Sequence, residues 1–229
     1  MSEENPIMRR IRSFVKREGR LTLGQERALE NLFPLYGLPF QETPLDLDHV
    51  FKRTAPRILE IGFGNGSSLS EMARNNPKQD YLGIEVHRPG VGNLLKQIEE
   101  MSLTNLRVSN DDAVDVLNKM IDNASLDAVY LFFADPWHKS RHYKRRIVQN
   151  DFVALLRKKL KVGGVFHMAT DWEDYAKHMM RVMNQSEGFE NTAGKDQYLP
   201  RPEYRPVTKF EKRGQRLGHG VWDLIFKKI

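Results

Sequence analysis

The chain has 229 residues, a formal net charge of +6 and no cysteine. This length suits one α/β domain better than two separate cores, and the lack of cysteine excludes disulfides, thiolate zinc sites and cysteine nucleophiles. A hydrophobic content of 40% is enough to form a core, while the longest apolar runs have the length of strands rather than of membrane spans.

The chain starts with a polar and basic segment, residues 1–20, in which Met1–Pro6 lack the apolar core of a secretory signal. We predict that this segment is a flexible arm, that residues 21–229 form a single domain, and that the protein is cytoplasmic with no membrane partner. A helix should begin the domain near Thr22–Leu32, with Pro34 helping to end it.

Short apolar runs alternate with helical patterns from Arg57 onward, as in a doubly wound, mostly parallel sheet. The expected strands lie near Arg57–Ile61, Asp80–Glu85, Leu106–Ser109, Leu126–Ala134 and Val165–Ala169. The expected helices lie near Ser67–Asn75, Pro89–Met101, Ala113–Met120, Asp151–Lys161 and Trp172–Asn184. Gly163 and Gly164 should turn the fourth of these helices into the fifth strand, and Val221–Phe226 should form a late antiparallel strand at or near the sheet edge.

A glycine-rich turn follows the first strand, with Gly62, Gly64 and Gly66 in G-x-G-x-G spacing. Glycine lets a ligand approach the backbone, but in the dinucleotide fingerprint the third glycine stands one position later. The spacing found here, with Glu60 just ahead of it, is associated with S-adenosylmethionine, whose methionine ammonium and sulfonium need carboxylates. The loop alone would also fit a tight structural turn or a nicotinamide site.

Acidic residues follow the next two strands. Glu85 ends the second strand, where a carboxylate can accept both ribose hydroxyls of a cofactor. Asp111 and Asp112 follow the third strand, where an acid can hydrogen-bond an adenine amino group, although each acid would also serve as a helix cap. Because open α/β sheets bind ligands at the carboxyl ends of their strands, we expect the acids and the glycine turn to form one cofactor site.

The segment after the fourth strand contains Asp135, Pro136 and Trp137. A carboxylate can accept from guanine N1–H and N2–H while an aromatic ring stacks on the base. The plainer interpretation is that Asp135 only forms the turn and Trp137 only packs. We prefer the base-binding interpretation, because a basic run begins immediately afterwards.

That basic run, residues 139–146, contains no acid and interleaves cations with an aromatic, as RNA-binding segments do. A charged run is usually a solvated surface, and the position beside the expected site is what favours RNA here. His138 and His142 stand four residues apart but have no obvious third ligand, so we expect no metal. Further along, Asp171 follows the fifth strand as a substrate contact or a helix cap, and the pattern of residues 205–214 indicates a basic surface loop.

Taken together, these segments resemble the bacterial tRNA (guanine-N7)-methyltransferase family of the TrmB type. The resemblance covers nearly the whole chain and rests on EIGFGNG at 60–66, GIEVH at 83–87, DPWHK at 135–139, RHYKRR at 141–146, HMATDW at 167–172, RPVTKFE at 205–211 and GHGVWDL at 218–224. The residues at 9–22 also resemble the family's basic arm. The resemblance implies a Rossmann-like class I S-adenosylmethionine-dependent methyltransferase with a seven-stranded sheet.

The resemblance also implies roles for individual residues. Asp135 becomes the catalytic residue. The cofactor residues are Glu60, Gly62, Gly64, Gly66, Glu85, Asp112 and Asp135. The substrate-binding residues are Lys139, Asp171, Thr208, Lys209, Phe210 and Glu211, and the RNA-interacting residues are Arg141, His142, Tyr143, Lys144, Arg145 and Arg146. Ala134 departs from the family, which usually has proline before the aspartate.

The implied reaction is transfer of the adenosylmethionine methyl group to N7 of guanine 46 in the tRNA variable loop, leaving S-adenosylhomocysteine. Guanine N7 carries a lone pair, so direct in-line attack needs no general base. We expect tRNA as the partner of a monomeric enzyme that uses no metal. The rival hypotheses are a nicotinamide-dependent oxidoreductase, a non-catalytic RNA-binding protein on the same fold, and a methyltransferase with another RNA or a small molecule as substrate.

Overall fold

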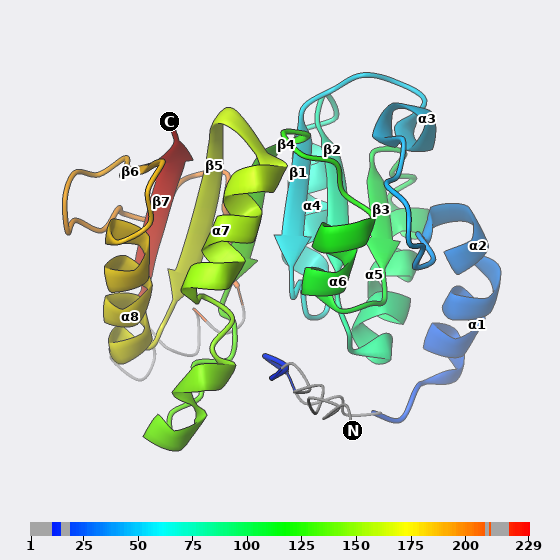
Figure 1. Ribbon diagram of the computed structural model, residues 1–229. Helices are drawn as coiled ribbons and strands as arrows, with labels where there is room; N and C mark the ends of the chain where they lie inside the picture. The colour runs from blue at the N-terminus through cyan, green and yellow to red at the C-terminus, as the bar shows by residue number, and fades with distance from the viewer. Residues whose placement is uncertain (1–10, 15–18, 209–210, 212–219) are drawn as a thin grey trace, which may run out of the picture.

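A central sheet organises the protein in the computed structural model, which describes residues 11–14, 19–208, 211 and 220–229. In this part of the chain the sheet has seven strands in the order β3-β2-β1-β4-β5-β7-β6 (Figure 1). The strands are β1 (Arg57–Ile61), β2 (Asp80–Ile84), β3 (Leu106–Ser109), β4 (Leu126–Phe132), β5 (Leu160–Thr170), β6 (Phe189–Asn191) and β7 (Trp222–Lys228). β1 to β5 pair in parallel, and β7 pairs antiparallel with both β5 and β6. The predicted doubly wound, mostly parallel seven-stranded sheet is confirmed.

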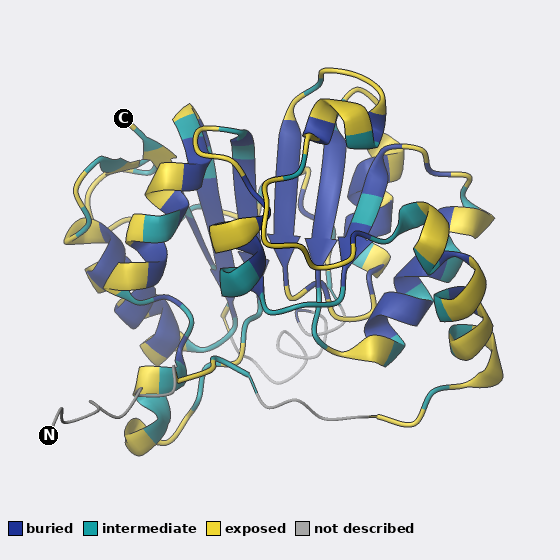
Figure 2. Ribbon diagram, turned by 45° about the vertical axis from the view of Figure 1, so that its right-hand side comes forward, coloured by how far each residue is buried: buried dark blue, intermediate teal, exposed yellow. Residues whose placement is uncertain are grey.

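Helices cover both faces of this sheet, as Figure 1 shows. The helices are α1 (Leu23–Asn31), α2 (Phe33–Tyr36), α3 (Leu47–Phe51), α4 (Ser67–Asn75), α5 (Arg88–Glu100), α6 (Ala113–Lys119), the 3-10 helix η1 (Ser140–Arg145), α7 (Asn150–Lys159) and α8 (Glu173–Asn184). One apolar core joins the sheet to α3, α6, α7 and α8, and a second joins it to α1, α4 and α5. The central strands are buried between these layers (Figure 2). Among the described residues, no helix is long and apolar enough to cross a membrane.

Local sequence accounts for where several elements begin. At the start of α1, Thr22 and Gln25 form a reciprocal capping box, in which each side chain accepts from the other residue's backbone N–H. The α6 helix begins after Asp112, whose carboxylate accepts from Val114 N at 2.9 Å. The α4 helix begins after Gly66 in a left-handed conformation, with φ of 79°.

Two sequence predictions differ from the structure. Pro34 lies in the first turn of α2, where its missing N–H costs nothing, so it starts a helix as well as following one. Gly163 and Gly164 lie inside β5 rather than in a helix-to-strand turn, since α7 ends at Lys159 and β5 begins at Leu160. They fall at an irregularity in the pairing with β4, where Leu126 faces Leu160 but Ala128 faces Val165.

The late strand was predicted as antiparallel at or near the sheet edge, and β7 confirms this, with β6 outside it. The short elements α2, α3 and β6 were not predicted. α2 and β6 contain no buried residue, unlike the equally short β1 and β3, and the five residues of α3 are too few to show a helical period.

Candidate functional site

The carboxyl ends of the parallel strands border a cavity of about 490 Å³. Its walls come from β1 and the turn after it, from the ends of β2 and β4, and from the residues that follow β3. In Figure 1, η1 and the segment 11–14 lie on the side of the sheet toward which the arrowheads of β1 and β5 point. Ser13 and Phe14 line the cavity together with Glu85, Asp112 and Asp135. This is the edge at which the sequence predicted a ligand.

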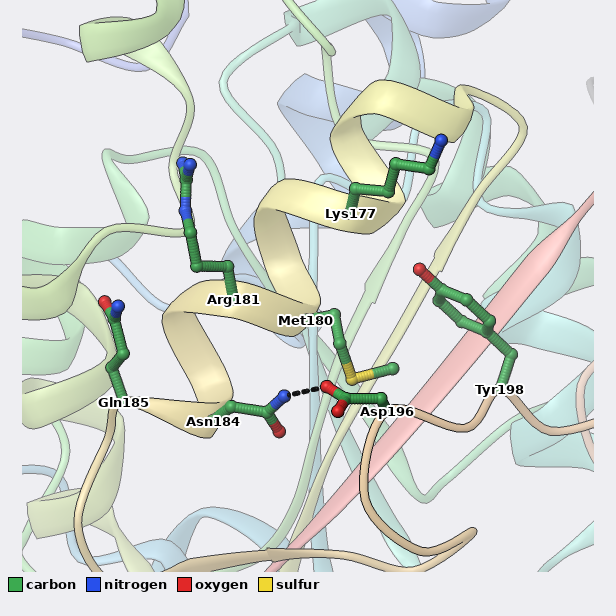
Figure 3. Close-up of a pocket in the computed structure, with 7 residues that line it drawn as sticks. All are labelled: Lys177, Met180, Arg181, Asn184, Gln185, Asp196 and Tyr198. Atoms are coloured by element: carbon green, nitrogen blue, oxygen red, sulfur yellow. Dashed lines mark hydrogen bonds between the residues drawn. The ribbon is translucent and has the colours of Figure 1, made fainter.

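A second hollow lies between α8 and the residues that follow β6, Asp196 and Tyr198 (Figure 3). Polar side chains dominate it, and Asn184 Nδ2 donates to Asp196 Oδ1 across it at 2.5 Å. None of the predicted site residues lies among those that line it. We therefore assign the chemistry to the first cavity.

The glycine turn has the shape that a cofactor requires. Gly62 and Gly64 have φ values of 74° and 61°, and a Cβ added at either would meet no protein atom within 4 Å. Gly66 also has a positive φ, but its Cβ would stand 2.7 Å from Leu94 Cδ1. A Cβ at Gly90, in the first turn of α5, would stand 2.1 Å from Gly64 O. The turn is thus packed against α5 on one side and open on the other.

A buried carboxylate lies directly before this turn. Glu60 is only 3% exposed, and among the described residues its Oε2 atom has no hydrogen-bond partner. Burial, followed by the nearby negative charge of Glu85, raises the pKa of Glu60 to about 8. An unpaired buried carboxylate is unfavourable unless a cation or a proton compensates it. The methionine ammonium of adenosylmethionine fits this requirement, and a pyrophosphate does not.

Glu85 connects the glycine turn to the end of β2. Its Oε2 accepts from Gly64 N and its Oε1 accepts from His87 N, each at 2.9 Å. The carboxylate lies in the cavity wall and retains lone pairs for further donors, as a ribose contact requires. Asp112 caps α6 and also lines the cavity, so its role as a helix cap is compatible with the predicted adenine contact.

Asp135 lines the same cavity as the predicted cofactor residues Glu85 and Asp112, and it follows β4. Trp137 N donates to Asp135 Oδ1 at 3.3 Å, and the indole Nε1 donates to Ser13 O at 3.1 Å. Phe133 and Trp137 on either side have φ values of 55° and 48°. Left-handed backbone at two bulky residues is uncommon and turns the chain sharply, leaving the Asp135 side chain exposed at the cavity.

The basic run forms η1 beside this turn. The Arg145 guanidinium lies 4.6 Å from the centre of the Trp137 ring, and the His142 ring meets Trp137 edge-on. The pKa of His142 is lowered by partial burial and then by neighbouring cations, first Arg141 and Arg145. Arg141 and Lys144 are exposed and present charge to solvent.

Arg146 is placed differently from the rest of the run. It is 2% exposed, its Nε donates to Pro136 O at 2.9 Å, and its Nη2 pairs with Asp174 on α8. Its guanidinium also lies 3.6 Å from the centre of the Tyr143 ring. In this position Arg146 holds the Asp135 turn and η1 against α8, and the RNA contact that the resemblance implies for it stays a prediction.

The predicted substrate residues lie on three segments. Lys139 is exposed just before η1, and Asp171 follows β5. Thr208 Oγ1 accepts from Glu211 N at 3.1 Å, and the Glu211 carboxylate is buried against Arg205. Lys209 and Phe210 lie outside the described residues. Within the described part, no group of three or more His, Asp or Glu side chains is placed to hold a metal ion, and His138 packs edge-on against Trp172, with ring centres 4.2 Å apart.

Comparison with known proteins agrees with this site. Residues 54–224 match a family model described as "Putative methyltransferase". A protein of Aeromonas hydrophila named tRNA (guanine-N(7)-)-methyltransferase is 61% identical, over 100% of this chain and 96% of its own. One of the same name from Serratia proteamaculans is 60% identical, over 99% of this chain and 95% of its own.

The chain belongs to the tRNA (guanine-N7)-methyltransferase family. It is an adenosylmethionine-dependent methyltransferase, as the resemblance implied and as the glycine spacing together with the acids after the strands favoured. Among solved structures, the 16S rRNA methyltransferase KamB aligns with a TM-score of 0.59 at 13% identity, covering 82% of this chain and 96% of its own. An antibiotic-related methyltransferase aligns with a TM-score of 0.54 at 16% identity, covering 80% and 93%. These likenesses show the Rossmann-like methyltransferase fold.

Some site residues were not found from the sequence. Ser13 and Phe14 lie against the cavity, although the sequence indicated only an arm outside the core. No local pattern marks their contact with Trp137, which joins positions 124 residues apart. Gly90 had a usable signal, because glycine inside a helix often marks a close approach.

Proposed function

We propose that this enzyme methylates N7 of guanine 46 in the variable loop of tRNA. The observation that carries the proposal is the position of Asp135, which stands in the wall of the cofactor cavity and directly before the basic η1. The name shared by the relatives supports the guanine N7 chemistry and the tRNA substrate. The resemblance of the sequence supports position 46.

The cofactor half of the site assigns a task to each residue. The open backbone at Gly62 and Gly64 receives the cofactor closely, while Gly66 holds the turn against α5. Glu60 provides negative charge for the methionine ammonium, and Glu85 and Asp112 accept from the ribose hydroxyls and the adenine amino group. Bound adenosylmethionine supplies an electrophilic methyl group on a sulfonium.

The transfer itself needs positioning rather than proton removal. Guanine N7 donates its in-plane lone pair to the methyl carbon in line with the breaking carbon–sulfur bond, and the sulfur retains that bond's electron pair. The base gains a positive charge and no proton moves, so no general base is required. Asp135 accepts from the guanine N1–H and N2–H, which orients the base, and its negative charge offsets the charge that the purine gains.

The RNA backbone is held by the exposed cations of η1 and by Lys139. We propose phosphate or base contacts for Arg141, His142, Tyr143, Lys144 and Arg145, and substrate contacts for Lys139, Asp171, Thr208, Lys209 and Phe210. The aromatic members offer stacking surfaces for loop nucleotides. A guanidinium stacked on Trp137, as Arg145 has, keeps its outer N–H groups free to reach phosphate.

The test compares methyl transfer from radiolabelled adenosylmethionine to unmodified tRNA and to the same tRNA with adenosine at position 46. Labelled 7-methylguanosine from the first substrate alone is expected. Label on both would keep the methyltransferase and overturn the position, and binding of adenosylmethionine without label on either would overturn the substrate. A rise in Tm with NAD instead of adenosylmethionine would favour the oxidoreductase, and binding of neither would favour a non-catalytic protein.

Asp135→Asn tests the catalytic assignment. Asparagine keeps the Oδ1 acceptor for Trp137 N, so the turn should survive, but an NH2 donor replaces its second acceptor oxygen and it carries no charge to offset that of the base. We expect kcat to fall by about 10- to 100-fold with little change in adenosylmethionine affinity. Asp151→Asn, at an exposed aspartate in the first turn of α7, is the matched control. An unchanged kcat in Asp135→Asn would remove this residue from the role.

A further inference from the structure

A buried arginine, Arg205, lies beside the end of β4, the strand that leads to Asp135. Arg205 is 0% exposed, and its guanidinium forms two hydrogen bonds to Asp223, Nε–Oδ1 at 2.7 Å and Nη2–Oδ2 at 2.8 Å. The same guanidinium bonds Glu211 through Nη1–Oε2 at 2.7 Å and Nη2–Oε1 at 3.3 Å. Asp223 and Glu211 are 1% and 2% exposed. One cation thus engages four carboxylate oxygens inside the protein, a geometry that only a planar fork of donors satisfies.

Two further side chains extend this network. His167 Nε2 lies 2.8 Å from Asp223 Oδ1, and Tyr204 Oη lies 2.8 Å from His167 Nδ1. Burial is the largest influence on His167 and lowers its pKa, so the ring is neutral. Its Nε2–H donates a hydrogen bond to Asp223, and its Nδ1 accepts a hydrogen bond from the Tyr204 hydroxyl. Burial acts to raise the pKa of Asp223, but hydrogen bonds from His167 and Arg205 outweigh it and the pKa is lowered. The cluster is fully hydrogen-bonded and keeps its charges.

The network joins the chain segments that lead into the substrate half of the site. The Arg205 guanidinium lies 5.8 Å from the Phe132 ring centre and 5.6 Å from the Phe133 ring centre, directly before Asp135. Asp223 on β7 pairs in register with Ala169 on β5, two residues before Asp171. Glu211 N donates to Thr208 Oγ1.

The Glu211 carboxylate is committed to this network. Both of its oxygens bond Arg205, which lies six residues earlier in the chain. Arg205 also bonds Asp223 on β7, and the neighbouring Tyr204 bonds His167 on β5, so the Glu211 carboxylate is tied to the sheet through Arg205. A substrate contact by the same carboxylate would break a buried ion pair.

We propose that Arg205 and Glu211 are positioning residues, which set the Thr208 segment against the ends of β4 and β5, and that Glu211 acts through Arg205 rather than by touching the substrate. The inference rests on the proposed function, because tRNA is the substrate whose transfer it governs. None of the network residues lines the cofactor cavity. Loss of the network therefore changes tRNA methylation and leaves adenosylmethionine binding intact.

A double-mutant cycle with Arg205→Lys, Glu211→Gln and the double variant tests this. Lysine keeps the charge but loses the fork, and glutamine keeps the size but loses the charge. Each single variant should lower kcat/KM for tRNA by about 10- to 100-fold, measured well below its own Tm, with adenosylmethionine Kd within about twofold of wild type. The double variant should be no worse than the poorer single variant, because both changes break one unit.

Hydrogen–deuterium exchange of the free protein gives a second readout that a substrate contact would not move, and it serves if Arg205→Lys does not fold. Glu211→Gln should speed exchange over residues 204–208 without tRNA present. Additive losses in the cycle, unchanged exchange, or wild-type kcat/KM in Glu211→Gln would each overturn the inference. Failure of the wild-type enzyme to methylate tRNA would instead overturn the proposed function, so the two failures are distinguishable.

Discussion

The Gly66→Ala variant should be less stable than the wild-type protein, because the backbone conformation and the packing at Gly66 both disfavour a side chain. Gly66 has φ of 79°, and a left-handed conformation costs an L-residue about 1–2 kcal/mol. Its Cβ would also stand 2.7 Å from Leu94 Cδ1 and 2.8 Å from Leu94 Cβ. Overpacking a buried side chain of this kind costs about 1–3 kcal/mol. We therefore expect a loss of about 2–5 kcal/mol in the free energy of unfolding, or roughly 5–20 °C in Tm for a domain of this size.

Gly64→Ala is the matched control in the same turn. Gly64 has a similar φ of 61°, but its Cβ would meet no protein atom within 4 Å, so only the conformational cost of about 1–2 kcal/mol applies. The added methyl group instead occupies the open side of the turn, where the cofactor backbone contact is proposed. We therefore expect Gly64→Ala to lose much of its adenosylmethionine affinity and only a little of its Tm.

Thermal unfolding and adenosylmethionine titration of both variants measure the two effects separately. The expected pattern is a large loss of Tm in Gly66→Ala and a large loss of affinity in Gly64→Ala. Equal Tm values for the two variants would refute the steric argument at Leu94. Wild-type affinity in Gly64→Ala would show that the cofactor does not approach this turn.

Two further predictions concern charge. The pKa of Glu60 is raised to about 8, so its proton stabilises the ligand-free fold below pH about 4.5, and this contribution is lost as pH rises through 8. Adenosylmethionine requires the ionised form, so its affinity should rise by about fivefold between pH 7 and 8. Calorimetry should find this rise absent in Glu60→Gln. Neutralising Arg141, Lys144 and Arg145 together should reduce the slope of log tRNA affinity against log salt by roughly 2–3. Neutralising Lys52 and Lys78, which precede β1 and β2 at the amino ends of the strands, should not change this slope. An unaltered slope in the triple variant would show that these residues form a solvated surface and do not contact phosphate.

The sequence predicted the central strands well, because they are buried and each forms a short apolar run in the sequence. The structure has β1 (Arg57–Ile61), β3 (Leu106–Ser109) and α4 (Ser67–Asn75) with the predicted bounds. The error at Gly163 and Gly164 has a physical cause, because glycine pairs punctuate turns and bulges alike. Only the partner strand decides between them, and β4 imposes the bulge.

The meeting of the proposed cofactor residues at one sheet edge was also open to prediction, since each of them stands at or near the end of a predicted strand. Once the strand order is known, Glu60, Glu85 and Asp112 are brought to one edge by the topology alone. The basic run was predicted by composition, but composition could not show that Arg146 turns inward to Asp174 while Arg145 stacks on Trp137. Identical residue types in adjacent positions differ here only through contacts with distant segments.

The substrate half depends on such distant contacts throughout. The predicted substrate residues Lys139, Asp171 and Thr208 come from separate parts of the chain, and the network of His167, Arg205 and Asp223 joins positions up to 56 residues apart. No periodicity or motif spacing encodes a hydrogen-bond network of that kind. A cofactor common to many enzymes can be bound by a compact local motif, whereas the orientation of one base relative to it requires rigid support from several parts of the chain. We propose that the buried ion pairs of Arg205 with Glu211 and Asp223 provide that support, so that Glu211 acts on tRNA methylation without reaching the substrate.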